Sequence, residues 1–188
     1  MLAGHPPRNG VYLTIAIDGR GASGKSALAT WLGGRLGDFT VIRGDDYFEP
    51  HDDPITWGDF NEQRLDTEVL SRLRAGERTI AFRPYDFPRR RVGREQAVVV
   101  QRGVIFERWF SLSLDVAWDL KVWVETPPDI CLQRGLARDG SAVLGERARL
   151  AWEQVWQPRE AVYIQKTSPL ESANLVVEGT VAFELQLE

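Results

Sequence analysis

Four residues near the start of the chain have the types and the spacing to bind phosphate. The pattern G-x-x-x-x-G-K-S is filled by Gly19, Gly24, Lys25 and Ser26. Glycines let the backbone turn tightly with its N–H groups pointing inward, and the helix that follows adds the positive end of its dipole. A lysine here can reach the β- and γ-phosphate oxygens, and a serine hydroxyl can coordinate a bridging Mg²⁺ ion. The pattern therefore predicts a site for a nucleoside triphosphate with Mg²⁺.

The residues on both sides of this pattern predict the strand and the helix that a phosphate loop needs. Residues 12–17 are an apolar run typical of a buried strand, and apolar residues 27, 28, 31 and 32 follow at helical spacing. A glycine-rich turn that carries a lysine by chance is the alternative, and the strand-turn-helix context argues against it. The residues expected to bind the nucleotide are Gly19, Gly21, Ala22, Ser23, Gly24, Lys25, Ser26 and Ala27.

Two adjacent carboxylates, Asp45 and Asp46, follow the next predicted strand, Phe39–Arg43. Because open α/β sheets bind ligands at the carboxyl ends of their strands, we expect this pair beside the phosphate loop. A carboxylate there can accept the proton of an attacking hydroxyl group. A solvated acidic turn is the alternative, and the nearby phosphate loop favours the functional interpretation.

Three later features are candidates for substrate or phosphate contacts. Residues 49–61 predict a loop over the site in which Asp59 binds sugar hydroxyls, although the two aromatic residues of this loop could instead dock on the core. The arginine run in residues 83–91 is either a solvated turn or a contact to phosphate and substrate. Arg134 and Arg138, a turn apart on a predicted helix, can clamp a transferring phosphate or can simply be exposed.

The predicted strands and helices alternate along the whole chain. Apolar runs predict strands at residues 39–43, 79–82, 97–100, 119–124 and 175–177. The run at 97–100 is expected to be a central parallel strand buried on both faces. Helices are predicted at residues 62–74, from residue 126 onward, and at 145–166 with a bend at Pro158. Right-handed crossovers then give an α/β fold of the P-loop nucleoside triphosphate hydrolase type, with helices on both faces of a parallel sheet.

Composition limits the classes of protein and of partner. The 188 residues predict one domain over 11–188 after a loose arm at 1–10. No apolar run approaches the roughly 20 residues that cross a bilayer, and residues 1–10 lack the apolar core of a signal peptide, so we expect a cytoplasmic protein without a membrane partner. A formal charge of -4 offers no global attraction to nucleic acid. The single cysteine, Cys131, allows no internal disulfide and makes a zinc site improbable.

Among phosphate-loop proteins of this size, the motifs favour a small-molecule kinase. A GTPase would need an Asn-Lys-x-Asp motif, and none of the three asparagines precedes a lysine. A motor or remodelling ATPase would normally need a longer chain and partner subunits. A small-molecule kinase needs a phosphate loop, an acid at the second strand end, arginines on a helix and a pocket loop, and the sequence predicts all four.

Five segments together resemble the uridine kinase and phosphoribulokinase superfamily in order and approximate spacing. They are GRGASGKS at 19–26, DDYF at 45–48, PYDF at 84–87, GVIF at 103–106 and RGLARD at 134–139. The PYDF segment looks like uridine-cytidine kinase, whereas DDYFEP with the later WGD looks like nicotinamide riboside kinase. The resemblance covers about residues 12–175.

The resemblance implies a reaction, its cofactors and a set of site residues. ATP with Mg²⁺ would phosphorylate a hydroxyl of a small, nucleoside-like acceptor, and a homodimer is a further implied arrangement. Asp45 would be the base and a magnesium ligand together with Ser26, while Lys25 and Arg138 would act on the transferring phosphoryl group. Arg134 would contact ATP. The acceptor contacts would be Asp46, Tyr47, Asp59 and Tyr85.

Three positions depart from the superfamily pattern. Arg102 stands where relatives have a magnesium-binding glutamate before the glycine of the fourth motif, and Gly135 stands where uridine kinases tend to have a ribose-contacting arginine. The histidine expected shortly after PYDF is replaced by arginine within residues 89–91. The alternatives to a uridine kinase-like enzyme are a nicotinamide riboside kinase-like or other small-molecule kinase, and a nucleotide-binding protein without turnover.

Overall fold

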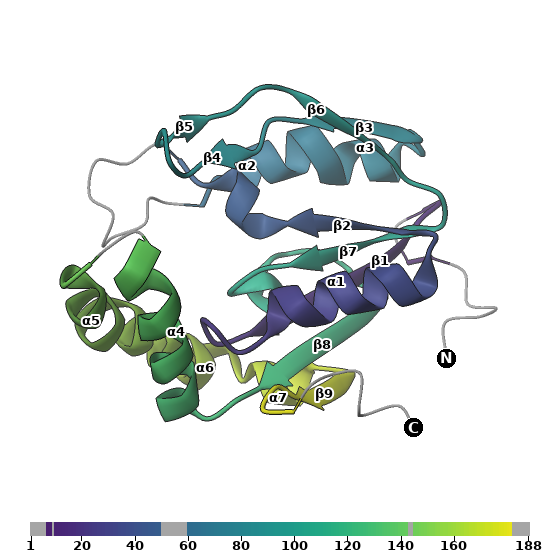
Figure 1. Ribbon diagram of the computed structural model, residues 1–188. Helices are drawn as coiled ribbons and strands as arrows, with labels where there is room; N and C mark the ends of the chain where they lie inside the picture. The colour runs from purple at the N-terminus through teal and green to yellow at the C-terminus, as the bar shows by residue number, and fades with distance from the viewer. Residues whose placement is uncertain (1–6, 9, 50–59, 143–144, 182–188) are drawn as a thin grey trace.

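A parallel sheet of five strands forms the centre of the computed structural model, which describes residues 7–8, 10–49, 60–142 and 145–181. The strand order is β2-β7-β1-β8-β9, and every neighbouring pair is parallel (Figure 1). The strands are β1 (Leu13–Gly19), β2 (Phe39–Arg43), β7 (Gly103–Glu107), β8 (Leu120–Glu125) and β9 (Leu175–Glu178). The predicted α/β fold class is confirmed.

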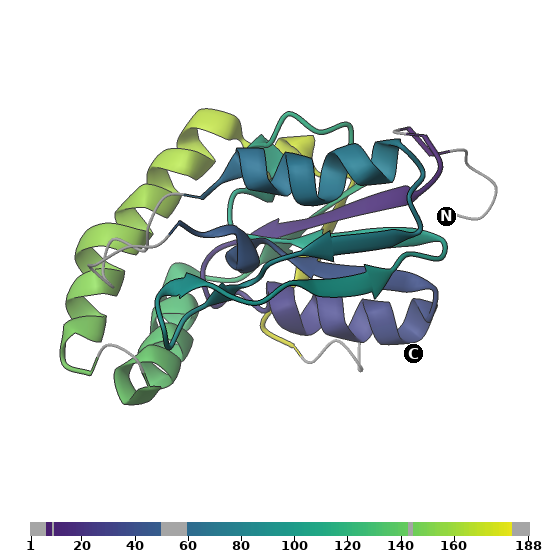
Figure 2. The same ribbon diagram turned by 90° about the horizontal axis from the view of Figure 1, so that it is seen from above.

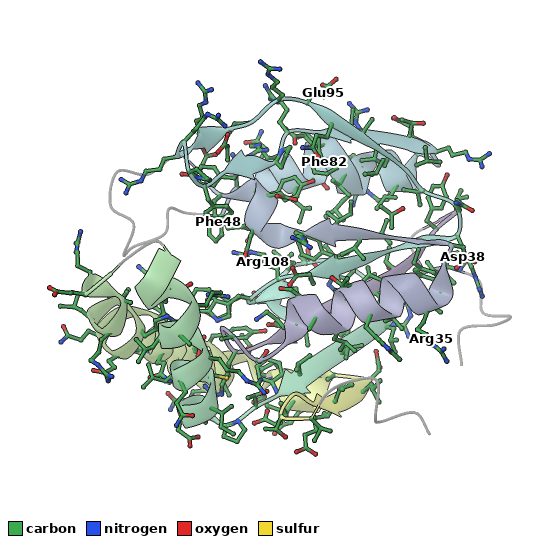
Figure 3. The ribbon with its side chains drawn as sticks, viewed as in Figure 1. Arg35, Asp38, Phe48, Phe82, Glu95 and Arg108 are labelled. Carbon is green, nitrogen blue, oxygen red and sulfur yellow. The ribbon has the colours of Figure 1, made fainter. Side chains whose placement is uncertain are left out.

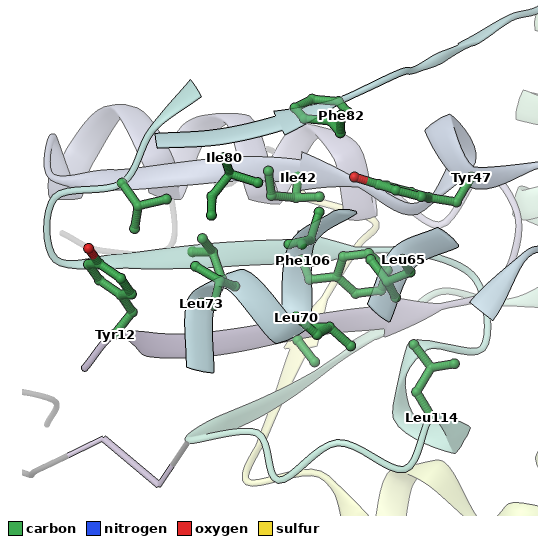
Figure 4. Packing of buried hydrophobic residues seen from close by; sticks show 14 of the residues in the cluster. Tyr12, Ile42, Tyr47, Leu65, Leu70, Leu73, Ile80, Phe82, Phe106 and Leu114 are labelled. Carbon is green, nitrogen blue, oxygen red and sulfur yellow. The ribbon is translucent and has the colours of Figure 1, made fainter. Parts of the chain in front are cut away.

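Helices cover both faces of this sheet, as Figure 2 shows. One face carries α1 (Lys25–Leu36). The other carries a continuous helical segment made of α2 (Glu62–Leu65), a π-helical turn η2 (Asp66–Leu70) and α3 (Ser71–Arg74). The apolar spacing that predicted this helix places Leu65, Val69, Leu70 and Leu73 in the core against the strands (Figure 4).

The prediction of a central strand at residues 97–100 is wrong. Residues 96–99 form β6 (Gln96–Val99), which pairs antiparallel with β3 (Thr79–Phe82) in a separate two-stranded sheet. Only Val98 of β6 packs against the core, and Val99 is 53% exposed. The strands beside β1 are instead β8 and β7, and every residue of β7 is buried. A short apolar run does not distinguish a central strand from a half-exposed one.

The chain after β8 forms a group of helices at one end of the sheet (Figure 1). It begins with α4 (Pro128–Ala142), as the Pro-Pro-Asp start signal predicted. It continues through α5 (Arg147–Leu150), the π-helical turn η4 (Ala151–Trp156) and α6 (Gln157–Thr167), followed by the short α7 (Pro169–Ser172). Pro158 lies in the first turn of α6, two residues after this π-helical turn ends, and the bend predicted there stays a prediction.

Three short elements connect these parts. The turn η1 (Gly44–Tyr47) follows β2, the hairpin of β4 (Tyr85–Asp86) and β5 (Arg91–Val92) follows β3, and η3 (Ser111–Ser113) follows β7. None of the described helices combines the length and the apolar character needed to cross a membrane. The division into an arm at 1–10 and one domain at 11–188 stays a prediction.

Candidate active site

Three strands end side by side at one edge of the sheet and surround a cleft. The register places Ile17 of β1 and Arg43 of β2 on either side of Glu107 of β7. The segments that follow these strands line a cavity of about 280 Å³. Six loop residues line it, namely Gly21, Ala22, Gly24, Lys25, Ser26 and Ala27. Asp45 and Arg138 line the same cavity, so the fold brings these predicted residues together.

The phosphate loop runs from Gly19 to Gly24 and needs glycine at both ends. The φ angle is +153° at Gly19 and +107° at Gly24, a region that side chains other than glycine rarely adopt. A Cβ at Gly19 would lie 2.6 Å from the Val124 carbonyl oxygen. Ser23 supports the loop from behind, since its side chain is fully buried and its carbonyl oxygen accepts a 2.9 Å hydrogen bond from Thr126 Oγ1.

The first turn of α1 offers its backbone N–H groups to the cleft. Its N-cap is Gly24, which has no side chain that could cap these groups. Uncapped N–H groups at a helix N-terminus attract an anion. Lys25 is 8% exposed, and its ammonium donates a 2.7 Å hydrogen bond to the Arg20 carbonyl oxygen across the loop. The loop therefore presents amide donors and one cation to the same cavity.

Glu107 is a site residue that the sequence analysis missed. It is the last residue of β7, it lines the cleft, and its Oε2 accepts a 3.2 Å hydrogen bond from Ser26 Oγ. Burial, followed by the charge of Asp45, raises the pKa of Glu107 to about 7. The signal in the sequence is a glutamate that directly follows the apolar segment GVIF.

The inference drawn from Arg102 is corrected by its position. Arg102 precedes β7, so it lies at the opposite end of that strand from the cleft, where it forms a 3.6 Å ion pair with Asp38. Glu107 supplies the carboxylate beside Ser26. The position of the magnesium-binding glutamate was therefore assigned to the wrong end of β7: it corresponds to Glu107, not to Arg102.

The two carboxylates after β2 have different environments. Both lie in the turn η1; Asp45 is exposed and lines the cleft, whereas Asp46 is half-buried and does not line it. Burial and the charge of Asp45 raise the pKa of Asp46 to about 6. Of this pair, Asp45 is the carboxylate that faces the phosphate loop.

The remaining residues expected to contact an acceptor lie in different places. Tyr47 is fully buried in the core, where its ring stacks on Phe82 at 6.1 Å between centroids. Figure 4 shows both rings within the apolar cluster, so this position gives Tyr47 a packing role. Tyr85 is buried in the β4–β5 hairpin and lines a second cavity rather than the cleft. Asp59 lies outside the described residues.

The two arginines of α4 take separate positions. Arg138 lines the cleft and pairs with Asp139, its Nε donating to Oδ1 at 2.6 Å. Arg134 does not line the cleft, and its Nη1 donates a 2.8 Å hydrogen bond to the Gly179 carbonyl oxygen. Gly179 in turn packs against the phosphate loop, because a Cβ at this position would lie 2.3 Å from the Ser23 carbonyl oxygen. Arg134 therefore contacts the loop only indirectly, through Gly179.

Trp152 explains the glycine at position 135. A Cβ at Gly135 would lie 2.2 Å from the Trp152 ring, and a Cβ at Gly21 would lie 2.8 Å from the same ring. The indole Nε1 donates a 3.0 Å hydrogen bond to Asp139 Oδ2. The indole therefore fills the space between α4 and the phosphate loop, leaving no room for an arginine at 135. With Trp156, it forms an aromatic wall of the cleft.

A buried carboxylate from α6 also contacts the phosphate loop. Glu160 is 1% exposed, and its Oε1 accepts a 2.6 Å hydrogen bond from the Gly21 N–H. Within the part of the chain that the structure describes, its Oε2 has no hydrogen-bond partner, and Arg20 Nη1 lies 3.9 Å away. Burial raises the pKa of Glu160 to about 7, against the opposing effects of Gly21, Lys25 and Arg20. Nothing in the sequence near Glu160 indicated this contact.

Comparison with solved structures supports the fold. The chain is similar to a possible uridine kinase from Bacillus stearothermophilus, with a TM-score of 0.65, 18% identity, and coverage of 93% of this chain and 91% of that one. It is also similar to a candidate fructose transport system kinase from a Silicibacter species, with a TM-score of 0.64, 19% identity and coverage of 92% and 93%. No protein-family model and no curated protein matches the sequence. The similarity shows that the chain shares the α/β fold of these two proteins, in agreement with the fold that the motifs predicted.

Proposed function

We propose that this protein is an ATP-dependent kinase that phosphorylates a hydroxyl group of a small molecule. One observation supports this most directly: the cleft that contains the phosphate loop also contains the carboxylates of Asp45 and Glu107. Phosphoryl transfer to an alcohol needs a phosphate cradle, a cation and a carboxylate opposite them. The cleft combines all three.

Each residue would have a defined part in the transfer. Asp45 would accept the proton of the attacking hydroxyl as the oxygen forms its bond to the γ-phosphorus and the bond to the β-phosphate oxygen breaks. Lys25 and the loop amides would hold the β- and γ-phosphates, and Arg138 would approach them from α4. Arg134 would act on the nucleotide from the same helix. The products would be ADP and the phosphorylated acceptor.

The donor atoms in the cleft fit Mg²⁺. Ser26 Oγ and Glu107 Oε2 lie 3.2 Å apart, with Asp45 close enough to raise the pKa of Glu107 by its charge. Oxygen ligands of this kind suit Mg²⁺, which takes its other ligands from phosphates and water. Within the described residues, no group of three histidine, cysteine or acidic side chains could hold a metal alone. Bound Mg²⁺ would neutralise charge on the β- and γ-phosphates.

The acceptor is first proposed to be nucleoside-like. The PYDF segment supports a uridine or cytidine kinase, and the DDYFEP segment supports a nicotinamide riboside kinase. Asp46, Tyr85 and Asp59 remain proposed acceptor contacts; Tyr47 would have to leave its buried position to reach an acceptor. The alternative of a nucleotide-binding protein without turnover loses its main argument, because Arg102 lies far from the cleft.

Measurement of ADP release across a panel of acceptors tests the proposal. The panel is uridine, cytidine, nicotinamide riboside and pantothenate, each with ATP and Mg²⁺. We expect acceptor-dependent ADP release that falls at least about 100-fold in Lys25→Ala and in Asp45→Asn. Asp38→Asn, at the opposite end of the sheet from the cleft, is the matched control and should keep the full rate. Full activity in Asp45→Asn would contradict the assignment of the base.

A further inference from the structure

Arg108 places a buried cation beside the cleft. It directly follows Glu107, and its side chain is 9% exposed. Its aliphatic part passes over Gly44, where a Cβ would lie 2.4 Å from Arg108 Cβ, and its guanidinium lies 3.4 Å from the centroid of the Phe60 ring. Figure 3 shows Arg108 and Phe48 at the same end of the sheet.

This guanidinium lacks the partners that the other enclosed arginines have. Its Nε is buried without a hydrogen-bond partner, and no ion pair to it is found among the described residues. By contrast, Arg64 donates to Glu68 at 3.3 Å, and Arg20 lies 3.9 Å from Glu160. Burial lowers the pKa of Arg108 to about 10, although Asp45, Asp18 and Glu62 oppose this through their charges. Burying a cation without a hydrogen-bonded partner costs free energy, and a bound anion would reduce that cost.

The strand order places Arg108 on the acceptor side of the cleft. The phosphate loop follows β1, Arg108 follows β7, and Gly44 follows β2, in the spatial order β2-β7-β1. Because Arg108 packs on Gly44, it extends away from the phosphate loop, toward the side where Asp45 lies. Phe60, under the guanidinium, pairs with Phe48, which lines the cleft.

Positive charge extends beyond Arg108 on this side. The second cavity, of about 760 Å³ at the β4–β5 hairpin, is lined by Arg89, Arg91 and Arg94 and by a single acid, Asp86. Ring contacts connect the two cavities, from Tyr85 to Phe87 at 5.0 Å and from Phe87 to Phe48 at 6.1 Å between centroids. The chain as a whole has a net charge of -4, so this concentration of positive charge is a local feature of the hairpin.

We infer that Arg108 binds an anionic group, a carboxylate or a phosphate, of the molecule that is phosphorylated. The inference rests on the proposed function and narrows its acceptor to a hydroxylated anion. Arg108 is then a specificity-determining residue: its guanidinium holds the acceptor by charge-assisted hydrogen bonds beside Asp45. Uncharged nucleosides would lack this contact and bind more weakly.

The test measures binding to the full chain saturated with Mg²⁺ and a non-hydrolysable ATP analogue, so that the phosphate loop is occupied. Three matched pairs are compared by calorimetry: D-glycerate with glycerol, pantothenate with pantothenyl alcohol, and fructose 6-phosphate with fructose. The first two pairs test a carboxylate and the third a phosphate. We expect at least one anion to bind at least about 10-fold more tightly than its neutral partner. A lack of anion preference in all three pairs overturns the inference.

Variants separate this role from packing. Arg108→Met should lose the anion preference, Arg108→Lys should keep part of it, and Arg102→Met, at the other end of β7, should keep all of it. The melting temperature of Arg108→Met without ligand should equal or exceed that of the wild type, because an unpaired buried charge is removed. A lower melting temperature, or an unchanged anion preference, would overturn the inference.

The same pairs distinguish this inference from the proposed function. An anion that binds through Arg108 but yields no ADP with ATP would count against the proposed function and would overturn the assignment of that anion as the acceptor, leaving only an anion contact at Arg108. ADP release with uridine at equal rates in the wild type and Arg108→Met would support the kinase and overturn the inference.

Discussion

At the scale of single residues, the phosphate loop is held by a carboxylate from a distant helix. Glu160 accepts from Gly21 N–H at 2.6 Å, although 139 positions separate the two residues. The cost of burying this charge is offset in part by Lys25, Arg20 and the loop amide. Because the folded protein raises the pKa of Glu160 from 4.5 to about 7, it favours the protonated form. Stability should therefore decline as pH rises from about 4.5 to 7.

Glu160→Gln should stabilise the protein at high pH. The amide oxygen can still accept from Gly21, and no charge is buried, so the free energy of unfolding should exceed that of the wild type by about 1–3 kcal/mol above pH 7. The difference should become small near pH 4.5, where Glu160 is protonated in the folded protein and about half protonated in the unfolded chain. Urea denaturation at pH 8 and pH 4.5 measures it. Glu153→Gln, an exposed pair partner of Arg149, should show little change; an equal gain at both pH values would contradict the explanation.

At the scale of elements, α4 and η4 meet through one interlocked contact. The indole of Trp152 occupies the space above Gly135, donates to Asp139 and packs beside Gly21. Trp152 therefore contacts α4 and the phosphate loop at the same time, within the apolar cluster that also contains Leu132, Leu136 and Trp156. Arg138, which lines the cleft from α4, depends on this contact for its place.

Gly135→Ala should destabilise the protein despite the higher helix propensity of alanine. The new Cβ would meet the Trp152 ring at 2.2 Å, so the ring or α4 must move, at a cost of about 1–3 kcal/mol. Gly140→Ala on the same helix is the control, because its Cβ would meet only Ala148 at 3.9 Å. That change should stabilise by about 0.5–1 kcal/mol. Thermal unfolding compares the stability of the two variants. Higher stability in both would show that the Trp152 ring can move away from the new Cβ at position 135 without cost.

At the scale of the whole molecule, Asp18 joins parts that the sequence separates widely. It lies near the end of β1 and is fully buried. Its carboxylate accepts hydrogen bonds from the N–H groups of Gly19, Phe110 and Leu112. Its Oδ2 also accepts a 2.6 Å hydrogen bond from the Tyr163 hydroxyl of α6. Burial raises the pKa of Asp18, and these hydrogen bonds oppose the rise. The sheet, the segment after β7 and α6 therefore meet at one carboxylate.

Tyr163→Phe should weaken this junction. It removes one of four donors to a buried carboxylate, and we expect a loss of about 1.5–3 kcal/mol in the free energy of unfolding. Tyr12→Phe removes a longer, 3.3 Å hydrogen bond to the neutral carbonyl of Gly76 and should cost about 0.5–1.5 kcal/mol. Urea denaturation of both variants provides the comparison. A smaller loss for Tyr163→Phe than for Tyr12→Phe would argue against Asp18 as the junction.

Most local elements could be predicted because short-range patterns encode them. The strand at 39–43, the helix at 62–74 and the start of α4 followed from apolar spacing and from Pro and Gly signals. The prediction failed at the choice of which strands pair with one another in the sheet. Residues 97–100 and 103–107 are both apolar runs, and only packing made the second the partner of β1.

The amino-acid sequence by itself determined the phosphate loop, because glycine conformations and a lysine at fixed spacing act within a few residues of one another. It also placed Asp45 at a strand end beside that loop. Only the tertiary structure decided that Glu107 meets Ser26, that Glu160 meets Gly21 and that the buried Arg108 Nε finds no hydrogen-bond partner among the described residues. Those contacts depend on which strands become neighbours and on where α6 docks, and long-range packing sets both.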